Sequence, residues 1–183
     1  MRQIIASEWV SLDGVFDSTN FGTWFNPYHS DSRAAYIQQT IDNCDAMLYG
    51  RNTYQMLYPY WSSLKNNEMG VADKLNNVKK YMVSGSITDA PWGDTTIISK
   101  DVIDAIAEIK QQPGGNILIQ GSGQLVNALL EAGLIDELKL LIQPHIAGYG
   151  ERLLQKPVAE GFQLKQAEQL EKGVIVLSYV PVK

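Results

Sequence analysis

The chain has 183 residues, of which 45% are hydrophobic and 19% charged, and its formal net charge is −5 at pH 7. This length and composition predict one globular domain over residues 1–183, and the mild acidity without a basic cluster argues against nucleic-acid or membrane-surface binding. A single cysteine, Cys44, excludes an intrachain disulfide, and two distant histidines argue against a metal site. No apolar run reaches the roughly 18 residues of a membrane span, and Glu8 interrupts the N-terminus before a signal-peptide core can form, so we expect a cytoplasmic protein.

The N-terminal quarter predicts a strand, a long loop and a helix. Residues 4–10 are apolar enough for a first strand, whereas residues 11–30 carry the glycines, asparagine and proline of a loop. Ser30 is a suitable N-cap for a helix that runs to about Asn43, with one apolar face. Cys44, between this helix and the next strand, is expected to be a small buried hydrophobic residue.

The next segment predicts a strand followed by a short helix. Residues 46–49 are apolar and end at Gly50, which marks the end of a strand. A helix is expected over residues 52–57, and Pro59 should stop it because proline removes a backbone donor. One or two further helical turns are expected within residues 70–77.

The middle of the chain predicts two strands, an amphipathic helix and a third strand. Residues 80–83 and 95–99 are strand-like. A helix with an apolar face begins at Asp101 and is broken at Pro113. Residues 116–120 form a short apolar run that suits a strand buried on both sides.

The C-terminal third predicts a helix and then three strands. Residues 124–132 are expected to be helical, with Gly133 as the C-terminal cap. A long strand is expected within residues 135–146, and residues 161–171 and 174–182 should form an antiparallel pair. The fold class is therefore α/β, with a mixed, mostly parallel central sheet, antiparallel C-terminal strands and helices on both faces.

Two strand-to-helix turns contain glycine and predict a site for an anion. They are Gly50-Arg51-Asn52-Thr53 and Gly121-Ser122-Gly123-Gln124. Ligands of open α/β sheets bind at the carboxyl ends of strands, and the unpaired N–H groups of a helix start attract anions. Each turn by itself is more commonly only a tight turn, and the full GxGxxG spacing is absent. The residues alone predict an α/β domain with an anion site and no particular chemistry.

Taken together, the motifs of the chain resemble the dihydrofolate reductase-like proteins related to the reductase domain of bacterial riboflavin biosynthesis. The resemblance covers nearly the whole chain, and the order and spacing of its motifs are more specific than any one of them. The segments that carry it are residues 11–14 (SLDG), 48–54 (LYGRNTY), 60–61 (YW), 83–84 (VS), 92–96 (WGDTT), 121–125 (GSGQL), 129–138 (LLEAGLIDEL), Pro144 and 148–150 (GYG).

This resemblance implies a three-layer α/β/α fold, NADPH as the cofactor, hydride transfer to a heterocycle or a carbonyl, and a homodimer. Residues 11–16 are expected beside the nicotinamide, and a cis peptide bond is expected between Gly121 and Ser122. Many relatives have arginine where this chain has Gly85, so Arg51 or Lys100 would have to contact the 2′-phosphate. The residues that the resemblance assigns to the cofactor are Gly50, Arg51 and Thr53 for its phosphates, Ser84 for the adenosine ribose, and Gly121, Ser122, Gly123 and Gln124 for its pyrophosphate.

The proton source and the substrate contacts are less clearly marked in the sequence. Asp31, at the predicted helix start, and Asp13, in an Asp-Gly pair, are the catalytic candidates, although Asp31 also suits a helix terminus and Asp13 a turn. Trp24, in the long loop, is the candidate substrate contact, since aromatic side chains can cover a flat heterocycle. We therefore expect an NADPH-dependent reductase of a small heterocyclic, pyrimidine- or pterin-like substrate; the alternative is a non-catalytic protein that binds a nucleotide or small ligand on the same fold.

Overall fold

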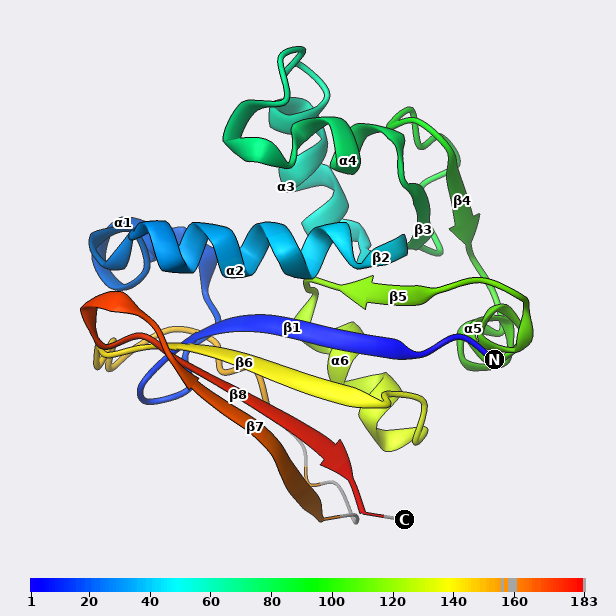
Figure 1. Cartoon of the computed structure of the whole chain (residues 1–183). Coiled ribbons are helices and arrows are strands. Elements are labelled where there is room, and N and C mark those ends of the chain that lie inside the picture. The colour runs from blue at the N-terminus through cyan, green and yellow to red at the C-terminus, as the bar shows by residue number, and fades with distance from the viewer. Residues whose placement is uncertain (156, 158–160, 183) are drawn as a thin grey trace.

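The computed structural model describes residues 1–155, 157 and 161–182, which form a single sheet covered by helices. The sheet has eight strands in the order β4-β3-β2-β5-β1-β6-β8-β7, and its five pairs from β4 to β6 are parallel (Figure 1). The pairs β6–β8 and β8–β7 are antiparallel. The predicted mixed sheet with antiparallel C-terminal strands is thus confirmed.

The strands lie close to their predicted positions. Their bounds are β1 Ile4–Ser11, β2 Cys44–Gly50, β3 Lys79–Val83, β4 Thr95–Ile98, β5 Asn116–Ile119, β6 Glu137–Gln143, β7 Phe162–Gln169 and β8 Ile175–Pro181. The central strands β2 and β5 are buried almost throughout, as expected of strands that are covered on both faces.

The α-helices are α1 Phe21–Trp24, α2 Asp31–Asp42, α3 Arg51–Trp61, α4 Ala72–Asn77, α5 Val102–Gln111 and α6 Gly123–Glu131. Short 3-10 helices are η1 Ser18–Asn20, η2 Asn26–Tyr28, η3 Glu68–Gly70 and η4 Glu171–Gly173. The predicted N-cap of α2 is confirmed, because the Ser30 hydroxyl accepts the N–H of Arg33. The 3-10 turn η4, with Lys172 at a φ of 56°, joins the last two strands.

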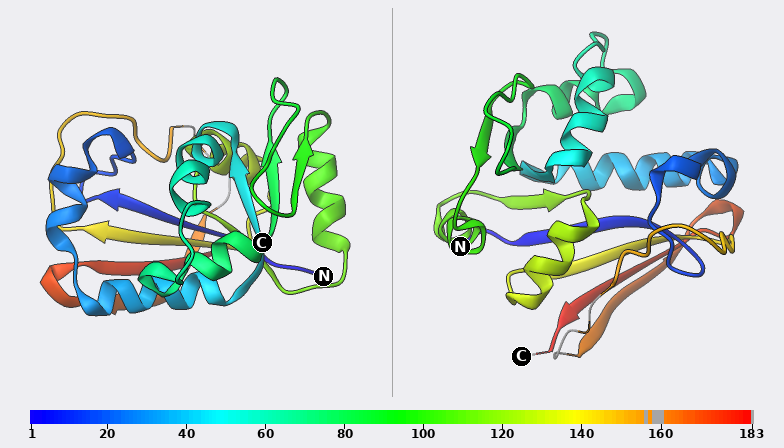
Figure 2. Two further views of the ribbon diagram at one scale, coloured as in Figure 1. Left: turned by 90° about the horizontal axis from the view of Figure 1, so that it is seen from above. Right: turned by 180° about the vertical axis from the view of Figure 1, so that it is seen from behind.

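Two hydrophobic layers hold the helices on opposite faces of the sheet, which confirms the predicted three-layer arrangement. Helices α2, α3 and α4 pack on one face, where Ile41 and Leu75 contact Met47 of β2 and its neighbours. Helices α5 and α6 pack on the other face through Ile106 and Leu129 (Figure 2). Cys44 is 3% exposed in the first of these layers, as predicted.

Two predictions about helices are wrong. Helix α3 does not stop at Pro59 but continues to Trp61, and the Ser62 N–H still donates to the Tyr58 carbonyl at 3.0 Å. Proline removes the backbone donor that would bond the Gln55 carbonyl, and the packing of Leu57, Tyr58 and Trp61 against the core offsets that loss. Residues 11–30 are not a plain loop either, because η1, α1 and η2 lie within them. Aromatic packing orders this segment: the Trp9 and Phe25 rings stack at 4.5 Å with planes 9° apart.

The parallel strands end at one common edge of the sheet. There β2 leads through Gly50 into α3, and β5 leads through the Gly121 turn into α6. Strand β1 lies between β5 and β6 and extends past the end of β5, since its pairing with β5 stops at Ala6 while its pairing with β6 reaches Ser11. The second half of β1 therefore lies beside the Gly121 turn.

Candidate functional site

The two glycine turns lie against each other. The Gly50 N–H faces the Gly121 carbonyl at 3.4 Å, and a methyl group on Gly50 would overlap the Oγ of Ser122. A methyl group on Gly121, whose φ is +81°, would lie 2.8 Å from the Oγ1 of Thr53. The Gly121–Ser122 peptide bond is cis, as predicted. The structure thus brings four of the predicted cofactor residues into direct contact.

Both turns present the starts of helices without side-chain caps. Gly50 caps α3 and Ser122 caps α6, and neither makes a side-chain capping hydrogen bond. The first N–H groups of a helix have no partner within the helix and carry partial positive charge. Two neighbouring uncapped helix starts therefore suit an anionic group such as a pyrophosphate.

Arg51 reaches from the first turn of α3 toward the end of β3. Its side chain is exposed, and its Nη1 donates to the Ser86 Oγ at 3.1 Å. Gly85 lies next to Ser86. A Cβ atom added to Gly85 would have the Ser99 carbonyl oxygen, at 3.9 Å, as its only neighbour within 4 Å. The guanidinium thus lies at the segment that contains Gly85.

The remaining predicted cofactor residues lie along the same edge. The Ser84 Oγ is buried and accepts the N–H groups of Ser86 and Ile87, at 3.3 and 3.0 Å. Gly123 packs against the Phe16 ring, and Gln124 is exposed at the start of α6. Ser84 therefore holds the turn after β3, and its contact with a ribose stays a prediction.

A cavity of about 570 Å³ opens beside the glycine turns, between β1 and helices α2 and α3. Thr53 and Gln120 line it where it meets the turns. Its walls are mostly apolar and include Trp9, Phe16, Phe21, Phe25, Leu57 and Trp61. Such a mostly apolar hollow with a few polar groups is typical of small-ligand sites.

Glu8 is the carboxylic acid that lines this cavity. It is 1% exposed, and its Oε1 accepts the Gly121 N–H at 3.0 Å. Burial raises the pKa of Glu8 from 4.5 to about 8, because a buried carboxylate loses its hydration, and the bond from Gly121 lowers that pKa by a smaller amount. Glu8 is therefore mostly protonated at pH 7.

Two further buried polar groups line the cavity. Arg33 is 3% exposed, donates through Nη1 to the Phe25 carbonyl at 2.6 Å and the Gln143 Oε1 at 3.2 Å, and leaves its Nε without a partner. The Tyr49 hydroxyl is also buried without a hydrogen-bond partner, and burial raises its pKa. Buried polar groups without partners are uncommon and suit a site that a ligand completes.

Neither predicted catalytic aspartate lines the cavity. Asp31 is exposed at the start of α2. Asp13 lies in the turn after β1, where its carboxylate accepts bonds from the Ser11 hydroxyl at 2.7 Å and from the N–H groups of Ala147 and Gly148 at 3.0 and 2.9 Å. These bonds hold the Asp13 pKa far below its usual range, with the Ser11 bond the largest cause. The catalytic role of either aspartate stays a prediction, and the geometry of Asp13 suits a turn anchor better than a proton donor.

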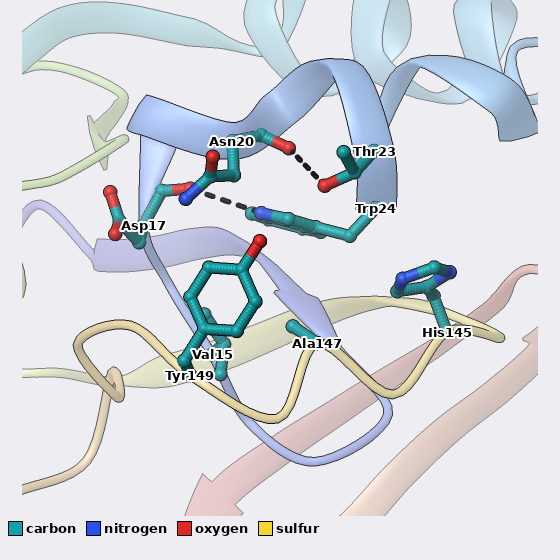
Figure 3. A pocket seen from close by; sticks show the side chains of 8 residues that line it. All are labelled: Val15, Asp17, Asn20, Thr23, Trp24, His145, Ala147 and Tyr149. Carbon is teal, nitrogen blue, oxygen red and sulfur yellow. Dashed lines mark hydrogen bonds between the residues drawn. The ribbon is translucent and has the colours of Figure 1, made fainter.

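Trp24, the predicted substrate contact, faces a different hollow. Its side chain is 1% exposed, its Nε1 donates to the Asp17 carbonyl at 3.0 Å, and it lines a pocket of about 90 Å³ with Tyr149 and His145 (Figure 3). Its neighbours Phe21 and Phe25 line the large cavity instead. Substrate contact by Trp24 stays a prediction, whereas the other aromatic residues of this segment are better placed.

Sequence reasoning missed Glu8, Arg33 and Tyr49 as members of the site. For Glu8 a signal was present: strand side chains alternate between faces, so Glu8 shares a face with Ala6 and Val10, which lie in the core. An acidic residue at a core position of an apolar strand is a functional candidate. Arg33 gave no such signal, because its burial depends on its contacts with Phe25 and Gln143, which are distant in the sequence or lie in a segment expected to be a loop. Tyr49 gave none either, because a tyrosine in an apolar strand does not reveal that its hydroxyl has no partner.

Comparison with protein families matches residues 2–176 to the RibD C-terminal domain. An uncharacterized protein of Bacillus subtilis (strain 168), YyaP, is 25% identical over 185 residues, which cover 97% of this chain and 94% of that protein. No helix within the described part of the chain is long and apolar enough to cross a membrane. Nor do the described residues include a group of three or more His, Cys, Asp or Glu that could hold a metal ion.

Solved structures share the fold at low sequence identity. A candidate riboflavin biosynthesis protein from Shewanella sp. PV-4 superposes with a TM-score of 0.74 at 19% identity, covering 100% of both chains. Dihydrofolate reductase from Enterococcus faecalis, solved in complex with NADP(H) and RAB-propyl, gives a TM-score of 0.64 at 12% identity, over 99% of this chain and 97% of that one. The chain therefore has the dihydrofolate reductase-like fold.

Proposed function

The chain belongs to the RibD C-terminal domain family, and from this premise we propose that it is an NADPH-dependent reductase of a small heterocyclic, pyrimidine- or pterin-like substrate. The cofactor would lie along the carboxyl edge of the sheet, and the substrate would occupy the cavity beside β1. The observation that carries the proposal is the contact between the two uncapped glycine turns at the mouth of that cavity.

The residues at these turns fit a dinucleotide. The helix starts at Gly50 and Ser122 provide backbone donors for a pyrophosphate, and Arg51 adds a charged donor near the turn after β3. The E. faecalis neighbour was solved with NADP(H), which supports the same cofactor here. A bound reduced nicotinamide supplies a hydride to an acceptor atom held against it.

The chain's own residues would hold the acceptor and keep water away from it. Phe16 and Thr53 lie beside the Gly121 turn and also line the cavity. The nicotinamide ring of the bound cofactor would lie at this place. The stacked Trp9 and Phe25 form a flat apolar wall, which suits a planar ring. Exclusion of water from such a cavity strengthens every polar contact inside it.

The alternative function is binding without turnover. It is kept because neither predicted acid, Asp31 or Asp13, lies at the cavity. Both functions need the cofactor turns, so cofactor binding tests the shared part, and hydride consumption separates the two.

The first test is a fluorescence titration with NADPH and, in parallel, with NADH, in which tryptophan emission and energy transfer to the nicotinamide are followed. Tight binding of NADPH and weaker binding of NADH are expected, because Arg51, whose guanidinium reaches Ser86, would contact the 2′-phosphate. Equal binding of NADPH and NADH would leave the proposal of a reductase standing and would refute the proposed contact with the 2′-phosphate. Binding of neither would refute the cofactor assignment.

A further inference from the structure

Arg33 is a buried cation whose guanidinium is bonded at one nitrogen only. The side chain is 3% exposed, and its Nη1 donates to the Phe25 carbonyl at 2.6 Å and to the Gln143 Oε1 at 3.2 Å. Its Nε is buried without a partner, and its Nη2 donates to no residue in the described part of the chain. Two of the three guanidinium nitrogens are therefore free to bind a ligand.

The two free nitrogens of Arg33 form one edge of its guanidinium. Nε and Nη2 direct their N–H bonds side by side in one plane, and an edge of this kind can bind both oxygens of a carboxylate at once. The two bonds from Nη1 fix the guanidinium from its other side, and the guanidinium carbon lies 4.1 Å from the centroid of the Phe25 ring. The free edge is thus held in one orientation before a ligand binds.

Arg33 approaches the cavity from helix α2. It lies in the first turn of that helix, and Ala34 and Ile37 of the same helix line the cavity together with it. Phe25, on which the guanidinium lies, also lines the cavity, and its ring stacks on that of Trp9. Because nearly all of the Arg33 side chain is enclosed by protein, the cavity is the space in which its free edge can receive a ligand.

No negative charge in the described part of the chain balances Arg33. The guanidinium forms no ion pair there with an aspartate or a glutamate. Glu8 lines the same cavity but is mostly protonated at pH 7, since burial raises its pKa to about 8. A buried charge without a partner is costly, and burial accordingly lowers the pKa of Arg33. A ligand with one negative charge would offset this cost.

A carboxylate matches this edge better than a phosphate does. It carries one negative charge and two oxygens in one plane, as a single guanidinium edge requires. A phosphate monoester carries about −1.5 to −2 charges at pH 7. Among the described residues that line the cavity, the other side chain that can become positively charged is His29, which is exposed. One guanidinium therefore balances a carboxylate and leaves a phosphate with excess charge.

Tyr49 adds a second unpartnered donor to the same cavity. Its side chain is fully buried, its hydroxyl has no hydrogen-bond partner, and it lines the cavity. A hydroxyl can donate its hydrogen to a ring nitrogen or a carbonyl oxygen. The polar groups that await a partner in this cavity can thus all act as donors, which favours a ligand with several acceptor atoms.

Building on the proposed function, we propose that Arg33 selects the substrate by binding, through Nε and Nη2, a carboxylate group on a flat heterocyclic ring. Tyr49 donates to an acceptor atom of that ring. The substrate class is therefore an ionised heterocyclic carboxylic acid, whose ring lies among the aromatic side chains of the cavity.

The first test measures the affinity of the wild type, without cofactor, for two pairs of probes by titration calorimetry. The pairs are pterin-6-carboxylate with pterin-6-carboxamide, and orotate with its carboxamide. Within each pair the two molecules have nearly the same size, and only one is charged. We expect the carboxylate of at least one pair to bind at least about 30-fold more tightly than its amide. Equal affinities within both pairs, or no binding of either carboxylate, would overturn the proposal.

The second test assigns the preference to Arg33. Arg33→Gln should reduce the preference for the carboxylate to less than about threefold, and Arg33→Lys, which keeps the charge but not the two-donor edge, should restore it only in part. Tyr49→Phe should weaken both members of a pair by a similar factor. Lys65→Gln, which removes an exposed positive charge outside the cavity, should match the wild type.

Several results of these titrations would contradict the assignment. A folded Arg33→Gln variant that keeps the wild-type preference, or an equal loss in Lys65→Gln, would overturn the role of Arg33. Tighter binding of 6-hydroxymethylpterin phosphate than of pterin-6-carboxylate would overturn the choice of a carboxylate. The comparison of probe pairs on the wild type decides the substrate class even if the Arg33 variants do not fold.

A parallel titration with NADPH separates this proposal from the proposed function. All folded variants should bind NADPH within about twofold of the wild type, because the cofactor turns are unchanged. Failure of the wild type to bind NADPH would refute the proposed function. A preference for the carboxylate probes is measured without cofactor, so its presence or absence is established independently of that result.

Discussion

The backbone of Gly50 packs directly against the side chain of Ser122, with no room for a methyl group between them. Through this contact the end of β2 and the start of α6 share one surface, although the two residues are far apart in the chain. The two helix starts consequently lie against each other, next to Thr53 and Gln120, which line the cavity.

Gly50→Ala should weaken NADPH binding by at least about tenfold, or roughly 1.4 kcal/mol. The φ of Gly50 is −74°, which any residue adopts, so the expected effect comes from overlap with Ser122 and not from backbone strain. The matched control is Gly22→Ala, since a methyl group there meets nothing within 4 Å. Equal NADPH affinity of the two variants in a fluorescence titration would show that the turn contact is unimportant for the cofactor.

Arg51→Gln should lower affinity for NADPH by about 10- to 100-fold while leaving affinity for NADH nearly unchanged, because a charge-assisted bond to a phosphate contributes about 1.5–3 kcal/mol. Arg51 is chosen because its guanidinium donates a hydrogen bond to Ser86, which lies beside Gly85. Lys100→Gln is the comparison, as Lys100 is the other candidate for the 2′-phosphate. If Lys100→Gln, and not Arg51→Gln, lost the preference for NADPH, the assignment would pass to the lysine.

The stability of the wild type relative to Glu8→Gln should fall as pH rises. The folded pKa of Glu8 is about 8 and its ordinary value is 4.5, so between these values the unfolded chain has released a proton that the folded chain still holds. The free energy of unfolding therefore falls from about pH 4.5 upward and levels off near pH 8. Between pH 5 and pH 7 the decrease amounts to roughly 2–3 kcal/mol. Urea unfolding of both proteins at the two pH values measures it, and a difference independent of pH would contradict the burial of an ionisable Glu8.

Asp13→Ala should lower the thermal midpoint by releasing the turn after β1 from Ala147 and Gly148. The Asp13 carboxylate joins these two segments, and the Arg152 guanidinium also bonds to the Asp13 carbonyl. Since the folded pKa is depressed, the carboxylate's contribution is present above its ordinary pKa of 3.8 and is lost as pH falls below that value. Asp89→Ala, at an exposed loop position, should leave the midpoint unchanged in the same calorimetric scan. Equal midpoints at neutral pH for both variants would argue against the turn-anchor role of Asp13.

Much of the fold could be predicted from local patterns. Short apolar runs that end at glycine, such as those before Gly50 and Gly121, identify parallel strands, and Ser30 identifies the start of α2. The end of α3 could not be predicted from Pro59, because the packing of Tyr58 and Trp61 against the core, which keeps the last turn helical, is a tertiary contact. The short helices within residues 11–30 depend on the stacking of Phe25 on Trp9, a contact that no local pattern shows.

The site could be predicted only in part. The glycine turns were visible because glycine between a strand and a helix permits close packing, and the cis bond at Gly121–Ser122 followed from the family resemblance. In the sequence Glu8 only interrupts an apolar segment, and its burial depends on the neighbouring Gly121 turn. Arg33 and Asp31 both lie in the first turn of α2, and the direction in which each side chain points decides which one reaches the cavity.

The most direct test of the central claim is a single turnover with NADPH that carries deuterium at the transferable position of the nicotinamide, followed by mass spectrometry of the acceptor. With 6-methyl-7,8-dihydropterin as acceptor, the proposed reductase predicts one deuterium on a ring carbon of the reduced product and an equal amount of oxidised cofactor. Tight binding of NADPH with no deuterium in this acceptor, nor in a panel of pyrimidines and pterins, would contradict the claim and identify the chain as a binding protein.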